Sequence, residues 1–300
     1  MTEISFPGLG IDPFKIDSVA FSVFGIDIAW YGVFITLGMV LAFFYCMNRA
    51  KYEGIKSDDM IDLAILLIVM GVLGARLYYV VFEFDQFVAT GGTIWQNIWQ
   101  TTKNVFNIRG GGLAIYGGII GGFFAALIMS KVKKIRFPIL ADVLMGGVFL
   151  GQVIGRWGNF TNGEAFGYET TLPWRMGINK ITAGGLYSTY MEVHPTFLYE
   201  SLWNLIGLIL LTVFYKKKKF HGQMFAFYLM WYGLGRAIIE GLRTDSLYIF
   251  GSDFLRVSQL LSIVLCLVGV VITVCGLLKA YKNIDVWAAV KSKLPKGKNN

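Results

Sequence analysis

Seven apolar stretches of about 20 residues alternate with short polar connections along the chain. A helix of that length spans the hydrocarbon core of a bilayer, so each stretch predicts a transmembrane helix. We expect these helices at about residues 28–47, 59–82, 112–130, 138–158, 195–216, 222–242 and 254–278. The pattern predicts an all-α integral membrane protein with seven transmembrane helices and a small external polar segment.

Two longer polar stretches, at about residues 83–110 and 160–195, interrupt this alternation, and residues 1–27 are polar to mixed. Within the first stretch one helical face carries Ile94, Trp95, Ile98, Trp99, Val105 and Phe106. This face predicts a short helix that lies in the outer membrane interface. Packing of the same face on the external polar segment is the alternative.

Composition agrees with a membrane protein, since 55% of the residues are hydrophobic, 15% are charged and the mean hydropathy is +0.58. The net charge of +8 could indicate a nucleic-acid partner, but 17 of the 27 basic residues fall on one predicted face. They form runs of three, four and four residues between helices and six lysines in the tail. The positive-inside rule places that face in the cytoplasm, with the N-terminus outside. No nucleic-acid partner is expected.

The expected organisation is one polytopic membrane domain over residues 1–283, followed by a basic cytoplasmic tail over 284–300. The first residues include Glu3 and no basic run, so we expect no cleavable signal peptide. The three cysteines lie in or at the end of apolar segments and form no metal-binding or disulfide pattern. His194 and His221 fall on opposite sides of the predicted membrane. We therefore expect no metal site and no cofactor.

The segment Gly155 to Gly167, G-R-W-G-N-F-T-N-G-E-A-F-G, concentrates polar residues where the fourth predicted helix ends. An arginine at that depth, Arg156, is costly unless an anion pairs with it. Its planar group with five donors suits two parallel bonds to a phosphate or carboxylate. The alternative is an arginine that only reaches out to the aqueous interface. Further candidates for substrate binding in this segment are Asn159, Asn162, Glu164 and Gly167.

This segment resembles the signature of the prolipoprotein diacylglyceryl transferases, G-R-x-G-N-F-x-N-x-E-x-x-G, and fills all eight fixed positions. The family's H-P-x-x-L-Y-E box is also intact and runs from His194 to Glu200. W-Y-G at 30–32, G-A-R at 74–76 and A-D at 141–142 are similar to the family as well. The resemblance covers nearly the whole chain, except the N-terminal tail, the interfacial stretch and the last twenty residues.

Six of the seven predicted helices place polar residues in the same outer layer of the membrane. These residues are Tyr31, Arg76, Tyr116, Arg156, His194, Arg236, Glu240 and Arg243. Scattered residues that each reach for the interface would not favour one leaflet. The pattern therefore predicts a shared cavity that opens to the outer leaflet.

The sixth predicted helix carries a polar stripe of Tyr232, Arg236, Glu240 and Arg243, spaced four, four and three residues apart. One interpretation is self-neutralisation, in which Glu240 pairs with both arginines. Two arginines against one carboxylate leave a positive surplus, to which Arg156 and Arg76 add. An anionic ligand would balance this surplus. The resemblance implies that the first arginine of the stripe is essential.

Residues 109–122, R-G-G-G-L-A-I-Y-G-G-I-I-G-G, form a glycine-dense entry into the third predicted helix. They are not a phosphate-binding P-loop, because no G-K-[ST] ending and no preceding strand is present. Gly117 and Gly121 are spaced as a pair that lets two helices approach closely. The resemblance implies a catalytic histidine where this chain has Tyr116. We expect Tyr116 to donate a hydrogen bond to the lipid head group or to the reacting sulfur.

The resemblance implies an enzyme of the bacterial plasma membrane that transfers a diacylglyceryl group from phosphatidylglycerol to the lipobox cysteine thiol of prolipoproteins. Arg156 and Arg236 would hold the charge that develops on the leaving phosphate. Tyr31 and Tyr232 could hydrogen-bond the lipid head group. The expected partners are phosphatidylglycerol, the signal peptides of prolipoproteins and membrane lipids.

Two other classes of protein could also use buried arginines. A transporter of an anionic solute or lipid would need polar residues that continue into the inner half of the membrane, where Asp62 and Asp142 are the main ones. A membrane protein that binds signal peptides without catalysis is the second alternative. An assay of the purified protein with phosphatidylglycerol and a lipobox peptide distinguishes the three.

Overall fold

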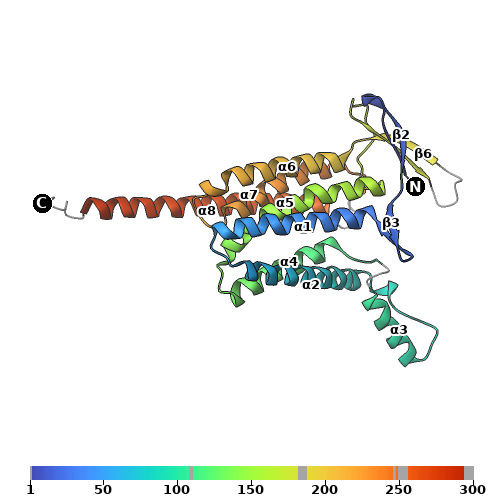
Figure 1. Ribbon diagram of the computed structural model, residues 1–300, viewed down its shortest axis with the longest axis horizontal. Helices are drawn as coiled ribbons and strands as arrows, with labels where there is room; N and C mark the ends of the chain where they lie inside the picture. Colours follow the sequence, from blue (N-terminus) through green and yellow to red (C-terminus); the bar gives the residue numbers. More distant parts are fainter. Residues whose placement is uncertain (1, 108–110, 182–187, 246–247, 249–255, 294–300) are drawn as a thin grey trace. The chain divides into compact units, whose positions relative to one another are not determined.

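The computed structural model describes residues 2–107, 111–181, 188–245, 248 and 256–293, and the backbone alone for 281–293. The helices are α1 Trp30–Tyr52, α2 Ser57–Phe82, α3 Ile94–Phe106, α4 Ile115–Val132, α5 Phe137–Asn162, α6 Thr196–Phe214, α7 Gln223–Glu240 and α8 Val257–Lys293 (Figure 1). The strands are β1 Thr2–Phe6, β2 Ile11–Ile16, β3 Val19–Val23, β4 Ile26–Ala29, β5 Met176–Ile181 and β6 Ser188–Val193. Each helix predicted from the sequence is present, and most of the ends agree within five residues. The last helix continues to Lys293, into the expected tail.

Six of these helices, within the part of the chain that the structure describes, are long and apolar enough to cross a membrane. They are α1, α2, α4, α5, α6 with the short 3-10 turn that follows it, and α8 up to Ala280. The shorter helix α7 is less apolar, because it carries Arg236 and Glu240. The protein is therefore a mostly helical membrane protein with six candidate spans.

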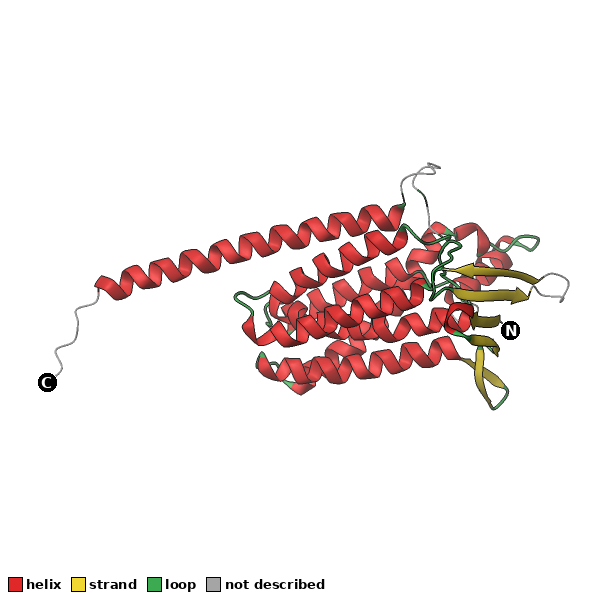
Figure 2. Cartoon of the chain, turned by 90° about the horizontal axis from the view of Figure 1, so that it is seen from above, coloured by secondary structure: helices red, strands yellow, loops and turns green. Residues whose placement is uncertain are grey.

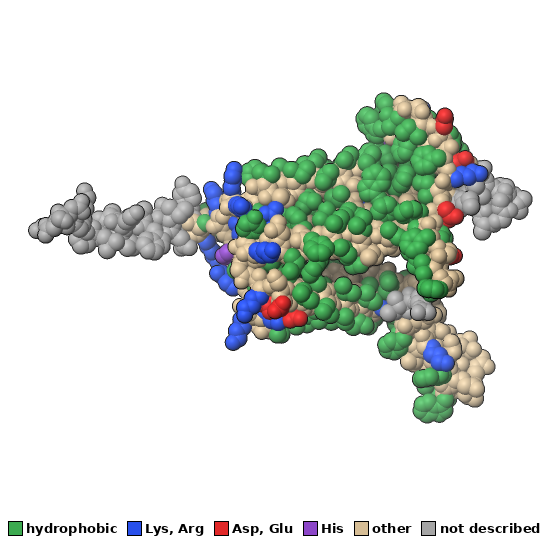
Figure 3. All heavy atoms as spheres, viewed as in Figure 1, with side chains coloured by type: hydrophobic (Ala, Val, Ile, Leu, Met, Phe, Trp, Pro, Cys, Tyr) green, Lys and Arg blue, Asp and Glu red, His purple; other side chains and the backbone are tan. Residues whose placement is uncertain are grey.

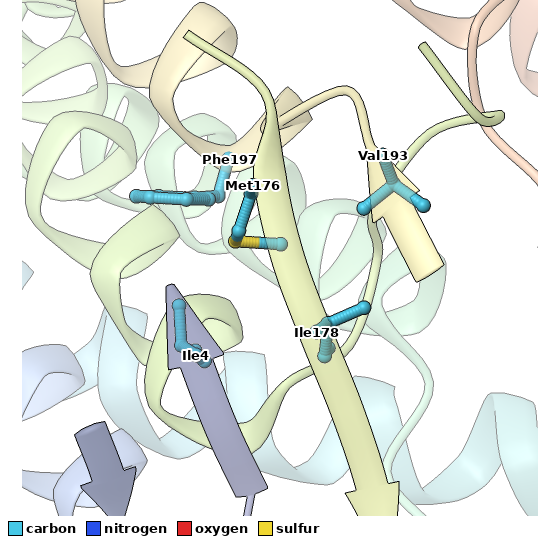
Figure 4. Packing of buried hydrophobic residues seen from close by; sticks show 5 residues of the cluster. All are labelled: Ile4, Met176, Ile178, Val193 and Phe197. Atoms are coloured by element: carbon cyan, nitrogen blue, oxygen red, sulfur yellow. The ribbon is translucent and has the colours of Figure 1, made fainter. Parts of the chain in front are cut away.

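The expectation of an all-α fold is wrong in one respect, because strands form outside the helices (Figure 2). An antiparallel sheet has the strand order β2-β1-β5-β6, so the start of the chain pairs with the polar stretch that precedes α6. Its buried side chains are Ile4, Met176, Ile178, Val193 and Phe197, the last on α6 (Figure 4). No local pattern signals this sheet, because β1 has only five residues and its partner β5 lies about 170 residues away.

The chain divides into two compact units, residues 1–46 with 142–300 and residues 47–141. In the first unit α1 and α5 pack closely through glycines, since a Cβ on Gly147 would lie 2.4 Å from the Sγ of Cys46. The helices α7 and α8 do the same, because a Cβ on Gly269 would lie 2.7 Å from the carbonyl oxygen of Ala226. The organisation as a single domain with a separate tail stays a prediction.

Asp142 of α5 holds the first turn of α7. Its fully buried carboxylate accepts hydrogen bonds from the backbone N–H groups of Gly222, Met224 and Phe225 at 2.9–3.0 Å. Lys218 Nζ lies 2.9 Å away and balances the charge. A carboxylate at a helix N-terminus satisfies donors that have no partner within the helix and interacts favourably with the helix dipole. Lysines and arginines gather at this end of the helices in the view of Figure 3.

In the second unit, α2 and α4 approach each other at glycines. A Cβ on Gly117 would lie 2.2 Å from the carbonyl oxygen of Gly74, and one on Gly121 would lie 2.0 Å from that of Met70. Side chains larger than hydrogen would separate the two helices. The prediction that these glycines serve helix packing is confirmed.

The predicted short helix is α3, and Thr93 and Gln96 form a capping box at its start. None of its residues is buried. Trp95 is 80% exposed and Trp99 62% exposed, which leaves the apolar face uncovered. Its position in the membrane interface stays a prediction, which this exposed aromatic face favours.

Arg76 of α2 fastens the connection between α3 and α4. Its guanidinium donates from Nε to the carbonyl of Val105, from Nη1 to those of Gly111 and Gly112, and from Nη2 to those of Asn104 and Asn107, all at 2.7–2.9 Å. An arginine has five N–H donors, so all of them are used. The carbonyls in the last turn of a helix lack the usual partner four residues on, and Arg76 supplies a donor to them at the end of α3. The guanidinium of Arg76 therefore has no N–H donor left for an anionic ligand, and its contribution of positive charge to the site stays a prediction.

We expect Arg76→Lys to lower the melting temperature of the purified protein in detergent. An ammonium offers three donors in place of five, and each charge-assisted hydrogen bond is worth about 1.5–3 kcal/mol. Arg136→Lys, at an exposed arginine of the same unit, is the matched control and should leave the melting temperature unchanged. Equal melting temperatures for the two variants would contradict a stabilising role of these five bonds.

Candidate active site

A buried carboxylate on α6, Glu200, lies between three arginines of the first unit. Its side chain is 4% exposed. One oxygen pairs with Nη2 of Arg156 on α5, and the other pairs with Nη1 of Arg236 on α7. Nη1 of Arg243 lies 3.6 Å from that second oxygen. Burial of this carboxylate is tolerable because several cations share its charge.

Glu200 is the residue that the sequence analysis missed as a member of the site. It was noted only as the last position of the H-P-x-x-L-Y-E box. The available signal was a carboxylate in the outer turns of an otherwise apolar helix, which by itself marks a functional candidate.

The polar stripe expected on α7 is only partly formed. Arg236 Nη2 pairs with the carboxylate of Glu240, four residues later on the same helix. The helix ends at Glu240, so Arg243 lies beyond it and does not extend the stripe. Arg243 instead makes two parallel hydrogen bonds to Asp245, at 2.9 and 2.7 Å. Burial alone would raise the pKa of Asp245, but the bonds and charge of Arg243 outweigh it and lower that pKa.

The balance of positive and negative side chains in this cluster differs from the balance expected from the sequence. Asp245 compensates Arg243, so the arginines at 156, 236 and 243 face three carboxylates rather than one. A further cation, Arg256 just before α8, donates to the backbone carbonyl of Glu240 and to the hydroxyl of Tyr168. Arg256 is not among the site residues expected from the sequence.

The signature segment forms the end of α5 and the turn after it. Asn159 and Asn162 both donate from their side-chain amides to one oxygen of Glu164, at 3.0 and 3.2 Å. Arg156 Nη1 lies 3.5 Å from the amide oxygen of Asn159. These contacts join the exposed Glu164 to the buried cluster.

Gly167, the last residue of the signature segment, contacts the residues just before α6 and just after α7. Its backbone N–H donates to the carbonyl of His194 at 3.0 Å, and it forms a β-bridge with Arg243. A Cβ at this position would lie 2.8 Å from the Cβ of His194 and 2.8 Å from the carbonyl oxygen of Leu242. Glycine is therefore required for the end of α5, the start of α6 and the end of α7 to meet here.

Two predicted aromatic residues and the histidine lie in the same unit. Tyr31 packs on the backbone of α5, where a Cβ on Gly158 would lie 2.6 Å from its ring. Tyr232 stacks on Tyr228, with ring centroids 5.5 Å apart.

A chain of hydrogen bonds holds the ring of His194. Its Nδ1 lies 3.2 Å from the hydroxyl of Tyr199, which accepts a bond from Trp174 Nε1 at 2.8 Å. Burial lowers the pKa of His194, which favours the neutral imidazole.

Tyr116 belongs to the other unit, residues 47–141, so its assignment to this site stays a prediction. It lies in the first turn of α4, and its ring centroid is 6.3 Å from that of Tyr78. Among the described residues, no group of three or more His, Cys, Asp or Glu side chains is arranged to hold a metal ion.

Arg156 has the most capacity left to bind an anion. Its side chain is 20% exposed, against 13% for Arg236 and 11% for Arg243. Within the described part of the chain its polar contacts are Glu200 and the long contact to Asn159, which leaves donors of the guanidinium for a ligand.

Comparison with known proteins gives one consistent result. Residues 18–275 match the family model described as prolipoprotein diacylglyceryl transferase. The chain is 45% identical over 260 residues to the phosphatidylglycerol–prolipoprotein diacylglyceryl transferase of Finegoldia magna, which covers 86% of this chain and 95% of that protein. The proteins of the same name from Clostridioides difficile and Acaryochloris marina are each 44% identical. They cover 85% and 92% of this chain and 94% and 92% of their own lengths.

Proposed function

The chain belongs to the prolipoprotein diacylglyceryl transferase family, and we propose that the arginine cluster around Glu200 is where it carries out this transfer. It is a multi-pass membrane enzyme whose substrates are phosphatidylglycerol and a prolipoprotein. The observation that carries the assignment of the site is the partly exposed Arg156, held in place by a buried carboxylate and with donors to spare.

The reaction forms one bond and breaks one. The sulfur of the lipobox cysteine attacks the terminal glyceryl carbon of the lipid, and the bond from that carbon to the phosphate oxygen breaks. Glycerol phosphate leaves with the electron pair, and the thiol proton passes to an acceptor. Negative charge grows on the leaving phosphate, so donors fixed in advance around that oxygen lower the barrier. Arg156 and Arg236 supply such donors in this proposal.

The other residues of the site have supporting roles in the proposal. Asn159, Asn162 and Glu164 shape the edge of the pocket next to Arg156, and Gly167 holds that edge against His194. The head group of the lipid would contact Tyr31 and Tyr232, while Glu240 and Arg243 orient Arg236 and Glu200. Tyr116 donates a hydrogen bond to the head group or to the reacting sulfur.

We also propose seven transmembrane helices, with the N-terminus outside and the C-terminus in the cytoplasm. Helix α7 has 18 residues and is about 27 Å long, close to the thickness of the hydrocarbon core. It packs on α8 from Gly233, near Ser262, to Ala226, near Gly269. This close packing supports α7 as the seventh span despite its two charged residues.

A transporter is not favoured by the residues that would have to form its inner path. Asp142 is occupied by the start of α7 and by Lys218, and Asp62 pairs with Lys133 at 2.6 Å. Both aspartates therefore have structural roles. The proposed activity is tested directly by incubating the purified protein with phosphatidylglycerol and a lipobox peptide, which should yield a thioether-linked peptide and glycerol phosphate.

We expect Arg156→Gln to lower kcat by at least about 100-fold, the cost of removing one positioned donor to a developing anion. Arg156→Lys should also lose at least about 10-fold, because a point charge cannot replace a planar fork. Arg175→Lys, at an arginine that pairs with Glu192 in the external sheet, is the control and should keep its activity. Near-normal transfer by Arg156→Lys would show that charge alone suffices.

Tyr116→Phe should be slow but measurable. A positioned hydrogen bond to a charged group is worth about 1.5–3 kcal/mol, a loss of roughly 10- to 150-fold. Tyr116→His should stay active if the histidine implied by the family resemblance can replace the hydroxyl. If Tyr116→Phe folded normally and was as inactive as Arg156→Gln, the hydroxyl would have to transfer a proton instead.

The topology predicts opposite accessibility for two single cysteines in a variant that lacks the three native ones. Thr189→Cys on β6 should react with a membrane-impermeant maleimide added to intact cells. Lys217→Cys, in the 3-10 turn after α6, should react only after the membrane is permeabilised. Labelling of both positions from outside would refute the seven-helix arrangement.

A further inference from the structure

Helices α6 and α7 are joined by a reciprocal pair of hydrogen bonds between two tryptophans. Trp203 Nε1 donates to the carbonyl oxygen of Trp231, and Trp231 Nε1 donates to that of Trp203, each at 2.8 Å. The two indoles are stacked, with centroids 4.6 Å apart and an interplanar angle of 22°. Both tryptophans lie outside the set of residues proposed for the site.

A glycine four residues after each tryptophan makes room for the indole of the other helix. A Cβ on Gly207 would lie 2.6 Å from the indole of Trp231, and one on Gly235 would lie 2.1 Å from the indole of Trp203. The chain therefore carries W-N-L-I-G on α6 and W-Y-G-L-G on α7, and the two motifs interlock. We call Trp203, Gly207, Trp231 and Gly235 the indole interlock.

These contacts fix the axial position of α6 relative to α7. Each residue of a helix advances the axis by about 1.5 Å, so a shift of one or two residues would break both bonds. No water competes for an indole N–H inside a hydrocarbon core, and an N–H without an acceptor is costly there. The two helices therefore have one favourable register rather than a range of them.

The fixed register bears directly on the arginine cluster. Glu200 lies three residues before Trp203 on α6, and Arg236 immediately follows Gly235 on α7. The Glu200–Arg236 ion pair is thus about one helical turn from the interlock. A change of register would move the Glu200 carboxylate away from Arg236. It would also move this carboxylate relative to Arg156, whose charge it balances.

We propose that Trp203 and Trp231 are positioning residues for the transfer reaction. They hold Glu200 opposite Arg236, so that the guanidinium groups of Arg156 and Arg236 stand at the correct depth for the phosphate. The inference rests on the proposed function of the arginine cluster. A displacement of about 1 Å at a reacting centre can cost up to about 100-fold in rate, so a small loss of register is enough to matter.

The test combines single variants with a double-mutant cycle. Trp203→Phe and Trp231→Phe each remove one N–H donor and keep an aromatic ring, and each should lower kcat/KM for phosphatidylglycerol by about 10-fold in the otherwise native protein. An Arg236→Lys background already lacks the guanidinium whose position depends on the register of α6 against α7. There the same Trp→Phe change should cost less than about two-fold.

Gly269→Ala is the matched control for lost helix packing, because it crowds α8 against Ala226 of α7 and leaves α6 untouched. It should lower the melting temperature, and its effect on kcat/KM should be the same in the native and in the Arg236→Lys background. The exciton signal of the stacked indoles in circular dichroism should disappear in either Trp→Phe variant and persist in Gly269→Ala. If Trp203→Phe does not insert, Trp231→Phe gives the same cycle.

Equal losses from Trp→Phe in both backgrounds, or no loss in the native background, would overturn the positioning role. Absence of transfer by the unmodified protein would instead refute the proposed function. The exciton signal and the melting temperatures would still report on the interlock in that case, so the two failures are distinguishable.

Discussion

Glu200 binds arginines from three different parts of the chain. The arrangement of the helix ends around it in the first unit depends on this shared carboxylate. Arg156 comes from the end of α5, Arg236 from the last turns of α7, and Arg243 from the turn beyond α7. An isolated charge would be prohibitive at this depth, because little water is present to solvate it. Opposite charges in contact make this burial tolerable, and they also explain why the arginines lie together rather than singly.

The helices can deliver these side chains to one place only if their packing is tight and their registers are fixed. Glycines bring the backbones of α1 and α5, and of α7 and α8, into close contact. Asp142 fixes the start of α7 at the opposite end of the helices, and the indole interlock fixes it halfway along. Helix α7, the least apolar of the proposed spans, is thus held along its whole length by specific polar contacts.

The external elements complete the same site from outside the helices. The β-bridge between Gly167 and Arg243, and the hydrogen bond from Gly167 to His194, tie the signature segment to the start of α6 and the end of α7. The sheet packs its buried side chains onto Phe197 at the start of α6 (Figure 4). The polar stretch before α6 therefore supports the helix that carries Glu200.

The sequence by itself determined the helices, because a membrane requires long apolar segments whose lengths and polar ends can be read directly. It also identified Arg156, Arg236 and the signature segment, since an arginine near hydrocarbon is rare without a function. Only the tertiary structure decided which charges pair. Arg76 turned out to bind backbone carbonyls, and Glu200 to join the arginines, because these contacts link positions far apart in the sequence. Arg243 turned out to pair with Asp245, because α7 ends at Glu240 and both residues lie beyond it. The sheet escaped prediction for the same reason, since β1 finds its partner β5 about 170 residues later and short strands carry almost no pattern of their own.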